Sequence, residues 1–508
     1  MSTIARKIGS GSVLRIINFF AQVLVAFFLM PFVVISLGDR MYGLWTLVGT
    51  FIGYYGVLDL GLSSAVQRYI AGAIGARNKD EMNRIFNTSV IIFTGLGIVV
   101  LLITIVLAGL SPLIFTNLDE RSLFSKIILL LGINIAISMP IRTFRGVLNA
   151  QLRFDIIAVI EFTSLVLRSA LVVLSLSLGY KLLGLALVTF LSSIPGNILF
   201  VFFAMKGLPF ITLKREYWDR GTRKFLFSYS FFTFIARIAD HIRFHVDVFI
   251  ITAFMGLSEV THYRIASLLI IYFIDLMGAA MGVLTSLFSQ QDGAKNLEAI
   301  RKTFFLATKI SICVSSFIGF GLIAWGKPFI ERWMGPEYLD AYPPLFILVL
   351  GCIIALWQTP SFALLYGTSK HGAIALFNSL EGVFNLLISF LLVRHYGLIG
   401  VAFGTFLPMV VNKLAIQPIY LSRVSPIQYV EYIYRVSRTA AIVCISLVIP
   451  TFISFYFAAP EFRILFPLGL VSSLFYFLGI WFMEFSLSER KILQHAIFPK
   501  LYTKEIAV

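Results

Sequence analysis

Charged residues are scarce in this chain. Only 13% of its 508 residues are Asp, Glu, Lys or Arg, whereas 59% are hydrophobic and 50 are Phe. Soluble globular proteins carry about 25% charged residues, so this composition excludes that class. The sequence predicts an all-α polytopic membrane protein, because its apolar runs reach the length of a membrane span.

Cysteines and catalytic motifs are also nearly absent. The three cysteines, Cys313, Cys352 and Cys444, lie in apolar stretches without C-x-x-C spacing, which predicts neither disulfides nor a metal site. Gly321–Lys327 has phosphate-loop spacing, but Pro328 stands where that motif requires Ser or Thr. We therefore expect no catalytic residues and no cofactor, and predict that the chain is not an enzyme.

The net charge of +16 does not indicate a nucleic-acid partner, because the basic residues mostly flank apolar runs. Most Lys and Arg fall in the even-numbered connections and in the two tails. By the positive-inside rule, both termini should be cytoplasmic, in a multi-pass protein of the cell inner membrane. The first apolar run continues to Leu37 without a signal-peptidase pattern, so we expect it to remain as the first span.

Fourteen apolar runs have spanning length. They are residues 14–37, 44–67, 90–115, 127–145, 156–178, 182–205, 225–254, 265–290, 308–330, 345–366, 372–393, 397–420, 439–457 and 466–485.

The chain also carries a duplication. The stretch from Asn78 to Phe86 corresponds to that from Asn296 to Phe304, and an ordered series of similar matches follows at offsets of 216 to 220 residues. Two six-helix repeats inserted in the same direction should enclose a central cavity. The predicted domains are a first half (1–205), a basic cytoplasmic linker (206–224), a second half (225–422), and two additional helices with a basic cytoplasmic tail (423–508).

The seventh run, Phe225 to Phe254, is the most charged of the spans. Its ionisable residues fall on one side of a helix; they are Arg237, Asp240, His241, Arg243, His245 and Asp247. Because charges at mid-bilayer need water or a partner, this face should line an aqueous cavity. Two interpretations stay open: the charges only neutralise one another as pairs at i,i+3 or i,i+4 spacing, or they line the cavity, with or without some pairing. No third ligand accompanies His241 and His245, so no metal site is predicted.

Other spans carry isolated ionisable residues. Arg168 is placed near mid-bilayer and joins the candidate substrate-binding cations Arg237, Arg243, His241 and His245. The candidate coupling or cavity acids are Asp240, Asp247, Asp59 and Asp275, the last two of which recur in both halves and can equally mark inherited architecture. Glu161 and Glu381 also recur, in a structural or a coupling role. Together with Lys413, they should lie close enough to the cytoplasmic edge to snorkel.

Three stretches near the N-terminus carry a family resemblance: Pro31 to Trp45, Tyr54 to Leu62, and Arg68 to Ala71. They are similar to the polysaccharide transporter family of Wzx-type O-antigen and exopolysaccharide repeat-unit flippases. That family belongs to the multidrug/oligosaccharidyl-lipid/polysaccharide exporter superfamily. The resemblance implies a flippase that moves undecaprenyl-pyrophosphate-linked oligosaccharide to the outer leaflet by alternating access.

The implied partners are that lipid-linked glycan, membrane lipids, and polysaccharide polymerase and assembly proteins. The implied energy source is coupling to H⁺ or Na⁺. A pyrophosphate headgroup needs a wet path with cationic donors, which agrees with the intramembrane arginines.

Three alternatives remain: a peptidoglycan lipid-precursor flippase, a multidrug or cation antiporter, and a membrane glycan polymerase or ligase. A cavity that mixes arginines with its acids argues against organic cations as substrates. Short predicted outer loops argue against the polymerase.

Overall fold

The computed structural model describes residues 2–219, 221–222, 246–281, 283–370, 372–456, 462–490 and 494. The charged centre of the predicted seventh span lies outside them, with Arg237, Asp240, His241, Arg243 and His245. The chain divides into two compact units, Met1–Thr261 (unit 1) and His262–Val508 (unit 2). The predicted boundaries of the two halves and the linker do not coincide with the boundary between these two compact units. Those predicted boundaries therefore stay a prediction.

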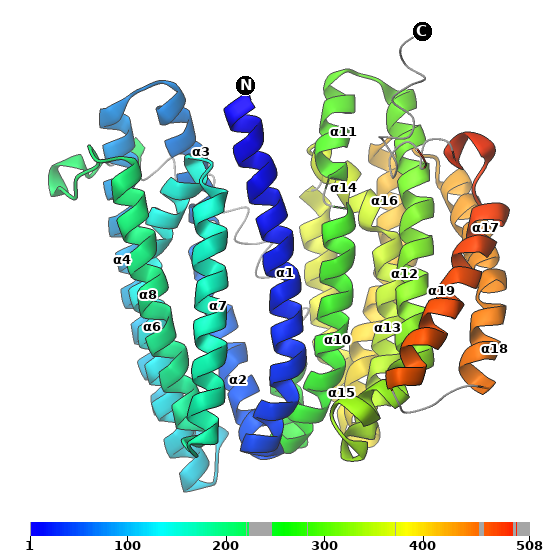
Figure 1. Cartoon of the computed structure of the whole chain (residues 1–508), viewed down its shortest axis with the longest axis horizontal. Helices are drawn as coiled ribbons and strands as arrows, with labels where there is room; N and C mark the ends of the chain where they lie inside the picture. The colour runs from blue at the N-terminus through cyan, green and yellow to red at the C-terminus, as the bar shows by residue number, and fades with distance from the viewer. Residues whose placement is uncertain are drawn as a thin grey trace. The chain divides into compact units, whose positions relative to one another are not determined.

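Unit 1 is a helical bundle (Figure 1). Its helices α4, α6, α8, α7 and α1 follow one another in packing order, each against the next. The described elements are α1 (Ser2–Leu37), α2 (Asp39–Tyr55), η1 (Val57–Asp59), α3 (Leu62–Gly75), α4 (Lys79–Gly109), α5 (Ser111–Ile114), α6 (Leu118–Ala150), α7 (Phe154–Ser177), α8 (Lys181–Gly207) and η2 (Arg215–Tyr217).

Unit 2 is helical as well, and the described residues of both units contain no strand. Helix α10 starts at the end of unit 1. The elements are α10 (Leu257–Met281), α11 (Leu284–Gly293), α12 (Leu297–Trp333), η3 (Pro336–Ala341), α13 (Tyr342–Trp357), α14 (Thr359–Gly367), α15 (Gly372–Val411), η4 (Asn412–Ile416), α16 (Gln417–Val424), α17 (Tyr429–Ser446), α18 (Val448–Tyr456) and α19 (Phe462–Met483).

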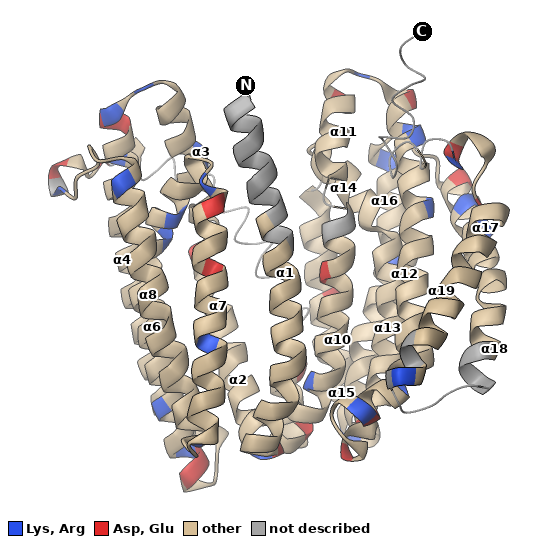
Figure 2. Ribbon diagram, in the orientation of Figure 1, with Lys and Arg blue, Asp and Glu red and all other residues tan. Residues whose placement is uncertain are grey.

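The helices confirm a polytopic all-α membrane protein. Nine candidate spans in the described part of the chain are long and apolar enough to cross a membrane. Charged residues gather toward the helix ends and are sparse between them (Figure 2). Every predicted span except the seventh coincides with a helix or with a helix broken by a turn. The second span, for example, is broken into α2 and α3 by a turn between Gly56 and Gly61.

The duplication is visible in the backbone. Four turns adopt a left-handed φ in both halves, and the second member of each pair follows the first by 217 or 218 residues. The pairs are Gly38 with Gly256, Arg77 with Lys295, Leu152 with Ser369, and Gly179 with Gly397. Two helix N-termini match as well: Asn78 caps α4 through the Glu81 amide at 3.0 Å, and Asn296 caps α12 through the Ala299 amide at 2.9 Å.

The structure explains the glycines of the N-terminal stretches that carry the family resemblance. Gly38 takes φ 77° between α1 and α2, and Gly61 takes φ 75° where the second span breaks. Gly43 packs directly on the backbone at the start of α10, where an added Cβ would lie 1.8 Å from the Leu257 carbonyl oxygen. The neighbouring Leu44 is fully buried in the same core cluster as Leu257. The motif glycines thus permit turns and close packing.

The first part of the predicted linker is held against α4 by two asparagines one helical turn apart. Asn83 accepts from the Thr212 amide at 3.0 Å and donates to the Phe210 carbonyl at 3.3 Å. Asn87 accepts from the Lys214 amide and donates to the Thr212 carbonyl, both at 2.8 Å. We call this arrangement the asparagine clamp. It satisfies the backbone of a segment that has no helix of its own.

Candidate functional site

In each unit, the turns that follow α3, α6, α11 and α14 carry basic residues, and we call that end of the unit its basic end. It is the end predicted to be cytoplasmic. In unit 1, Asp59 is buried between α2 and α3 and lies 3.2 Å from Arg142 of α6. The Ser63 hydroxyl donates to the same carboxylate at 2.5 Å. The structure therefore gives Asp59 a pairing role that fastens the broken second span to α6.

Arg145 lies one turn along α6 from Arg142 and pairs with Glu161 of α7. The two side chains stay 48% and 29% exposed, and the Arg145 guanidinium lies 5.7 Å from the Phe200 ring centre. Glu161 is thus partly accessible, and it joins α6 to α7.

Arg168 lies on α7, about 14 Å along the helix from Ser177. Its side chain is exposed in unit 1, and it has no hydrogen bond or ion pair within the described part of the chain. The helix around it is apolar enough to span the membrane. An arginine in this position needs water or an anionic partner rather than lipid.

Glu381 and Lys413 form a buried pair in unit 2. Their charged atoms are 3.7 Å apart, and the side chains are only 2% and 1% exposed. Both residues were expected to snorkel, and that prediction is wrong. Asn378 accepts from Lys413 at 3.3 Å, Asn412 donates to Glu381 at 2.5 Å, and the ammonium lies 4.6 Å from the Phe362 ring centre.

The backbone is irregular where Lys413 enters this network. Residues Asn412–Ile416 form one π-helical turn, a feature often found at functional sites. Gln358 donates both to the Lys413 carbonyl at 2.7 Å and to the Tyr432 hydroxyl at 2.6 Å. The network therefore extends from α15 through α14 to α17, and it gives Lys413 and Glu381 partners in the interior, where an unpaired charge is costly.

The remaining predicted acids lie in different surroundings. Asp275 is exposed on α10, with no partner among the described residues. Asp247 is buried in the described end of the seventh span, residues 246–254. That end packs on α2 through Phe249, whose ring centre lies 4.9 Å from that of Phe51. The structure does not bring the predicted site residues together into one described cluster.

Arg142 and Arg145 were missed by the sequence reasoning. They fall at the predicted end of the fourth span, whereas α6 continues to Ala150. The sequence did contain a signal for them, because two arginines three residues apart follow Pro140 in an apolar run. Their acidic partners come from other helices, so their pairing could not be derived from spacing along the chain.

A family model described as "Polysaccharide biosynthesis protein" matches residues 9–290. The chain is 23% identical to the "Putative O-antigen transporter" of Shigella flexneri, over 80% of this chain and 96% of that protein. It is 21% identical to the "Uncharacterized membrane protein EpsK" of Bacillus subtilis, over 80% of this chain and 81% of that protein.

Solved structures share the fold at low sequence identity. The lipid II flippase MurJ in an inward closed conformation matches 96% of this chain and 99% of its own, with a TM-score of 0.72 and 14% identity. An inward-facing multidrug resistance MATE family transporter of the MOP superfamily matches 78% and 95%, with a TM-score of 0.67 and 16% identity. This chain therefore has the fold that these two solved structures share.

Proposed function

Since this chain belongs to the polysaccharide biosynthesis protein family, we propose that it is a lipid-linked oligosaccharide flippase. Its cargo is an undecaprenyl-pyrophosphate-linked repeat unit, moved from the cytoplasmic to the outer leaflet of the inner membrane. The two halves provide alternating access, with both termini in the cytoplasm. The likeness to the O-antigen transporter, over nearly all of that protein, supports this cargo class.

The observation that carries the proposal is the exposed, unpaired Arg168 on an apolar, spanning helix of the described structure. A pyrophosphate crossing a bilayer needs cationic donors along a wet path. A guanidinium supplies several N–H donors and stays charged in any such environment. Arg168 is assigned to the headgroup path, together with Arg237, Arg243, His241 and His245, which lie outside the described residues.

Ion coupling to H⁺ or Na⁺ is assigned first to Asp275. Its carboxylate is exposed on α10, with no protein partner among the described residues. Asp59 and Glu161 already neutralise Arg142 and Arg145, so a structural role explains them without coupling. Asp247 and Asp240 remain further coupling candidates by charge.

Cells that lack the protein provide the test. Complete undecaprenyl-linked repeat units should accumulate on the cytoplasmic leaflet while surface glycan disappears. Unpolymerised units on the outer leaflet would instead indicate a polymerase or ligase. Accumulated peptidoglycan precursors would indicate a precursor flippase, and unchanged lipid-linked glycans an antiporter.

Arg168 is tested in the same cells at equal membrane abundance of the protein. Arg168→Gln should reduce surface glycan strongly, whereas Arg168→Lys should keep more of it, because it retains the charge. Equal and full activity in both variants would remove Arg168 from the headgroup path.

A further inference from the structure

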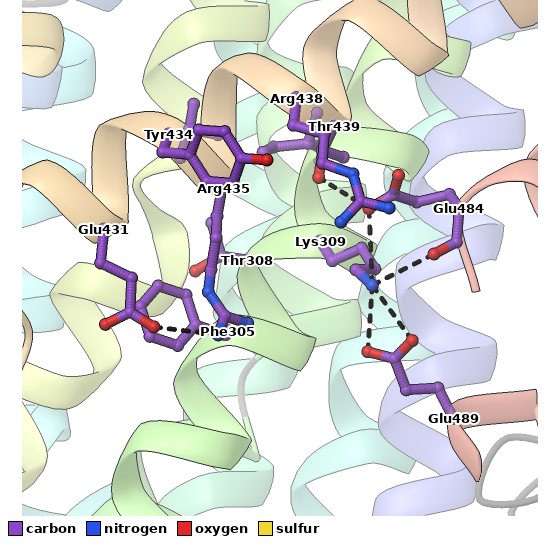
Figure 3. Close-up of a pocket in the computed structure, with 12 residues that line it drawn as sticks. Phe305, Thr308, Lys309, Glu431, Tyr434, Arg435, Arg438, Thr439, Glu484 and Glu489 are labelled. Atoms are coloured by element: carbon purple, nitrogen blue, oxygen red, sulfur yellow. Dashed lines mark hydrogen bonds and ion pairs between the residues drawn. The ribbon is translucent and has the colours of Figure 1, made fainter. Parts of the chain in front are cut away.

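A polar pocket lies within unit 2, where α12 of the predicted second half meets the helices that follow that half (Figure 3). It has a volume of about 380 Å³ and is enclosed by α12, α17 and the segment after α19. Pockets of this size bind small molecules or headgroups. Six charged side chains line it: Lys309, Glu431, Arg435, Arg438, Glu484 and Glu489.

Lys309 is fully engaged at the centre of this pocket. Its ammonium lies 3.0 and 3.1 Å from the two Glu489 oxygens, 3.4 Å from the Glu484 carboxylate and 3.2 Å from the Glu484 carbonyl. Burial raises the pKa of the Glu489 carboxyl, but hydrogen bonds from Ser486 and Lys309 outweigh this and lower it overall. Glu489 and Lys309 therefore form an ion pair on one side of the pocket, and their charges are not available to a ligand.

Two buried polar atoms in the pocket lining have no hydrogen-bond partner among the described residues. The Glu484 side chain is only 2% exposed. Its Oε1 accepts from Thr439 at 2.8 Å, whereas its Oε2 has no hydrogen-bond partner within the described part of the chain. The buried Thr308 hydroxyl, also in the lining, is likewise unsatisfied by the described residues. A buried carboxylate oxygen without a donor favours a ligand that brings N–H groups.

Arg438 supplies a positive charge in the same pocket, opposite in sign to that of Glu484. It is exposed, lines the pocket, and has no hydrogen bond or ion pair to the described residues. The neighbouring Arg435 is occupied, because it pairs with Glu431 at 2.9 Å and lies 4.2 Å from the Phe305 ring centre. Arg438 is therefore the guanidinium available to a phosphate.

The lining carries three acidic and three basic side chains, so it favours a ligand with both charges over a net anion. The surface beside it is apolar and exposed, for example at Tyr434 and Phe482, which suits acyl chains. We propose that the pocket binds the headgroup of a phospholipid with a primary amine. Its phosphate lies on Arg438, and its ammonium lies on Glu484 Oε2 and Thr308.

The test is native mass spectrometry of the full-length protein from micelles containing equal amounts of phosphatidylethanolamine, phosphatidylcholine and phosphatidylglycerol. Phosphatidylethanolamine should be retained most, because the choline headgroup has no N–H donor and the glycerol headgroup has no cation. Equal retention of all three lipids, or stronger retention of phosphatidylglycerol, overturns the proposal. Soluble phosphoethanolamine that binds as tightly as the lipid would assign the pocket to a soluble ligand instead.

Two variants separate the two ends of the headgroup. Arg438→Gln, at an exposed position, should weaken phosphatidylethanolamine and phosphatidylcholine alike by about tenfold, the loss of one charge-assisted contact. Glu484→Gln should remove the preference for phosphatidylethanolamine over phosphatidylcholine. Arg332→Gln, an exposed change on α12 outside the pocket, is the control and should change neither. An unchanged preference in folded Glu484→Gln contradicts the assignment of the amine, and unchanged retention in Arg438→Gln contradicts that of the phosphate.

Discussion

The two halves of this protein share turns at an offset of 217 or 218 residues, yet Glu161 and Glu381, which the sequence matches at an offset of 220, lie in opposite environments. Glu161 in the first half pairs with Arg145 where both side chains are partly exposed. Glu381 in the second half pairs with Lys413 in the interior. The cationic partner also occupies a different sequence position in the two halves. The residue 217 positions after Arg145 is Phe362, which carries no charge, and its ring lies beside the ammonium of Lys413.

This difference shows which features of a duplicated chain stay fixed and which diverge. Backbone turns persist because each needs a left-handed residue or a cap at one position to join two helices. Ion pairs can move between helices, provided that each buried charge keeps a partner. The second half holds a buried network around a π-helical turn, whereas the pair of the first half is partly exposed.

The largest expected effect comes from breaking the buried pair. Lys413→Met leaves Glu381 without its cation and should lower the free energy of unfolding by about 3–5 kcal/mol. The matched first-half variant, Arg145→Met, should cost about 0–1 kcal/mol, because water solvates the remaining glutamate. Thermal unfolding of the purified protein in detergent measures both. A second change, Glu381→Gln, should restore part of the loss in Lys413→Met, and equal losses in the two single variants would refute the contrast.

A smaller effect is expected at Gly43. A methyl group at this position collides with the Leu257 carbonyl, so Gly43→Ala should destabilise the protein by about 1–3 kcal/mol. The matched control is Gly49→Ala on the same helix, where an added Cβ meets no atom within 4 Å. The position 218 residues after Gly43 is Thr261, whose hydroxyl donates to the Asp39 carbonyl at 2.7 Å. If both alanine variants unfold at the same temperature, the close packing is not a stabilising contact.

The two N-caps should behave alike. Asn78→Ala and Asn296→Ala each remove one side-chain acceptor at a helix start and should each cost about 1 kcal/mol. The double variant should show the sum, because the two caps are far apart in the chain and share no partner. Comparison of the three unfolding temperatures tests this. Unequal losses of stability would show that the two equivalent caps contribute differently to the stability of the two halves.

The smallest stability effect is expected for Glu161→Gln, about 0–1 kcal/mol, since the pair is partly exposed. This variant separates the two roles left open for Glu161. Transport is measured as surface glycan at equal membrane abundance, and it should stay near normal if the residue only joins α6 to α7. A large loss of transport with unchanged unfolding temperature would assign Glu161 to coupling.

Sequence reasoning recovered the fold well because bilayer thickness dictates the length of each apolar run. The duplication could be predicted from the matches around Asn78 and Asn296, and the same residues cap α4 and α12 in the structure. The breaks within spans were not predicted. The break between Gly56 and Gly61 depends on left-handed residues within an apolar run, and hydropathy does not report them.

The sites were harder to predict than the fold. Lys413 was placed at the membrane edge by counting residues from a span boundary, yet α15 runs on into η4 and buries it beside Glu381. The polar pocket of unit 2 was not predicted, because its residues come from α12, α17 and the segment after α19, and no sequence periodicity reveals the contacts among them. Pairing across helices depends on tertiary packing, and a single sequence does not contain that information directly.

The asparagine clamp has a consequence for biosynthesis. All of its partners, from Asn83 to Lys214, precede the second half in the chain. The clamp can therefore close while the ribosome is still producing the second half, once α4 and α8 are in the membrane. The connecting segment would then be docked before the second repeat is inserted, and its start would be fixed at one place on α4. A nascent chain that ends at residue 219 already contains every group this docking needs.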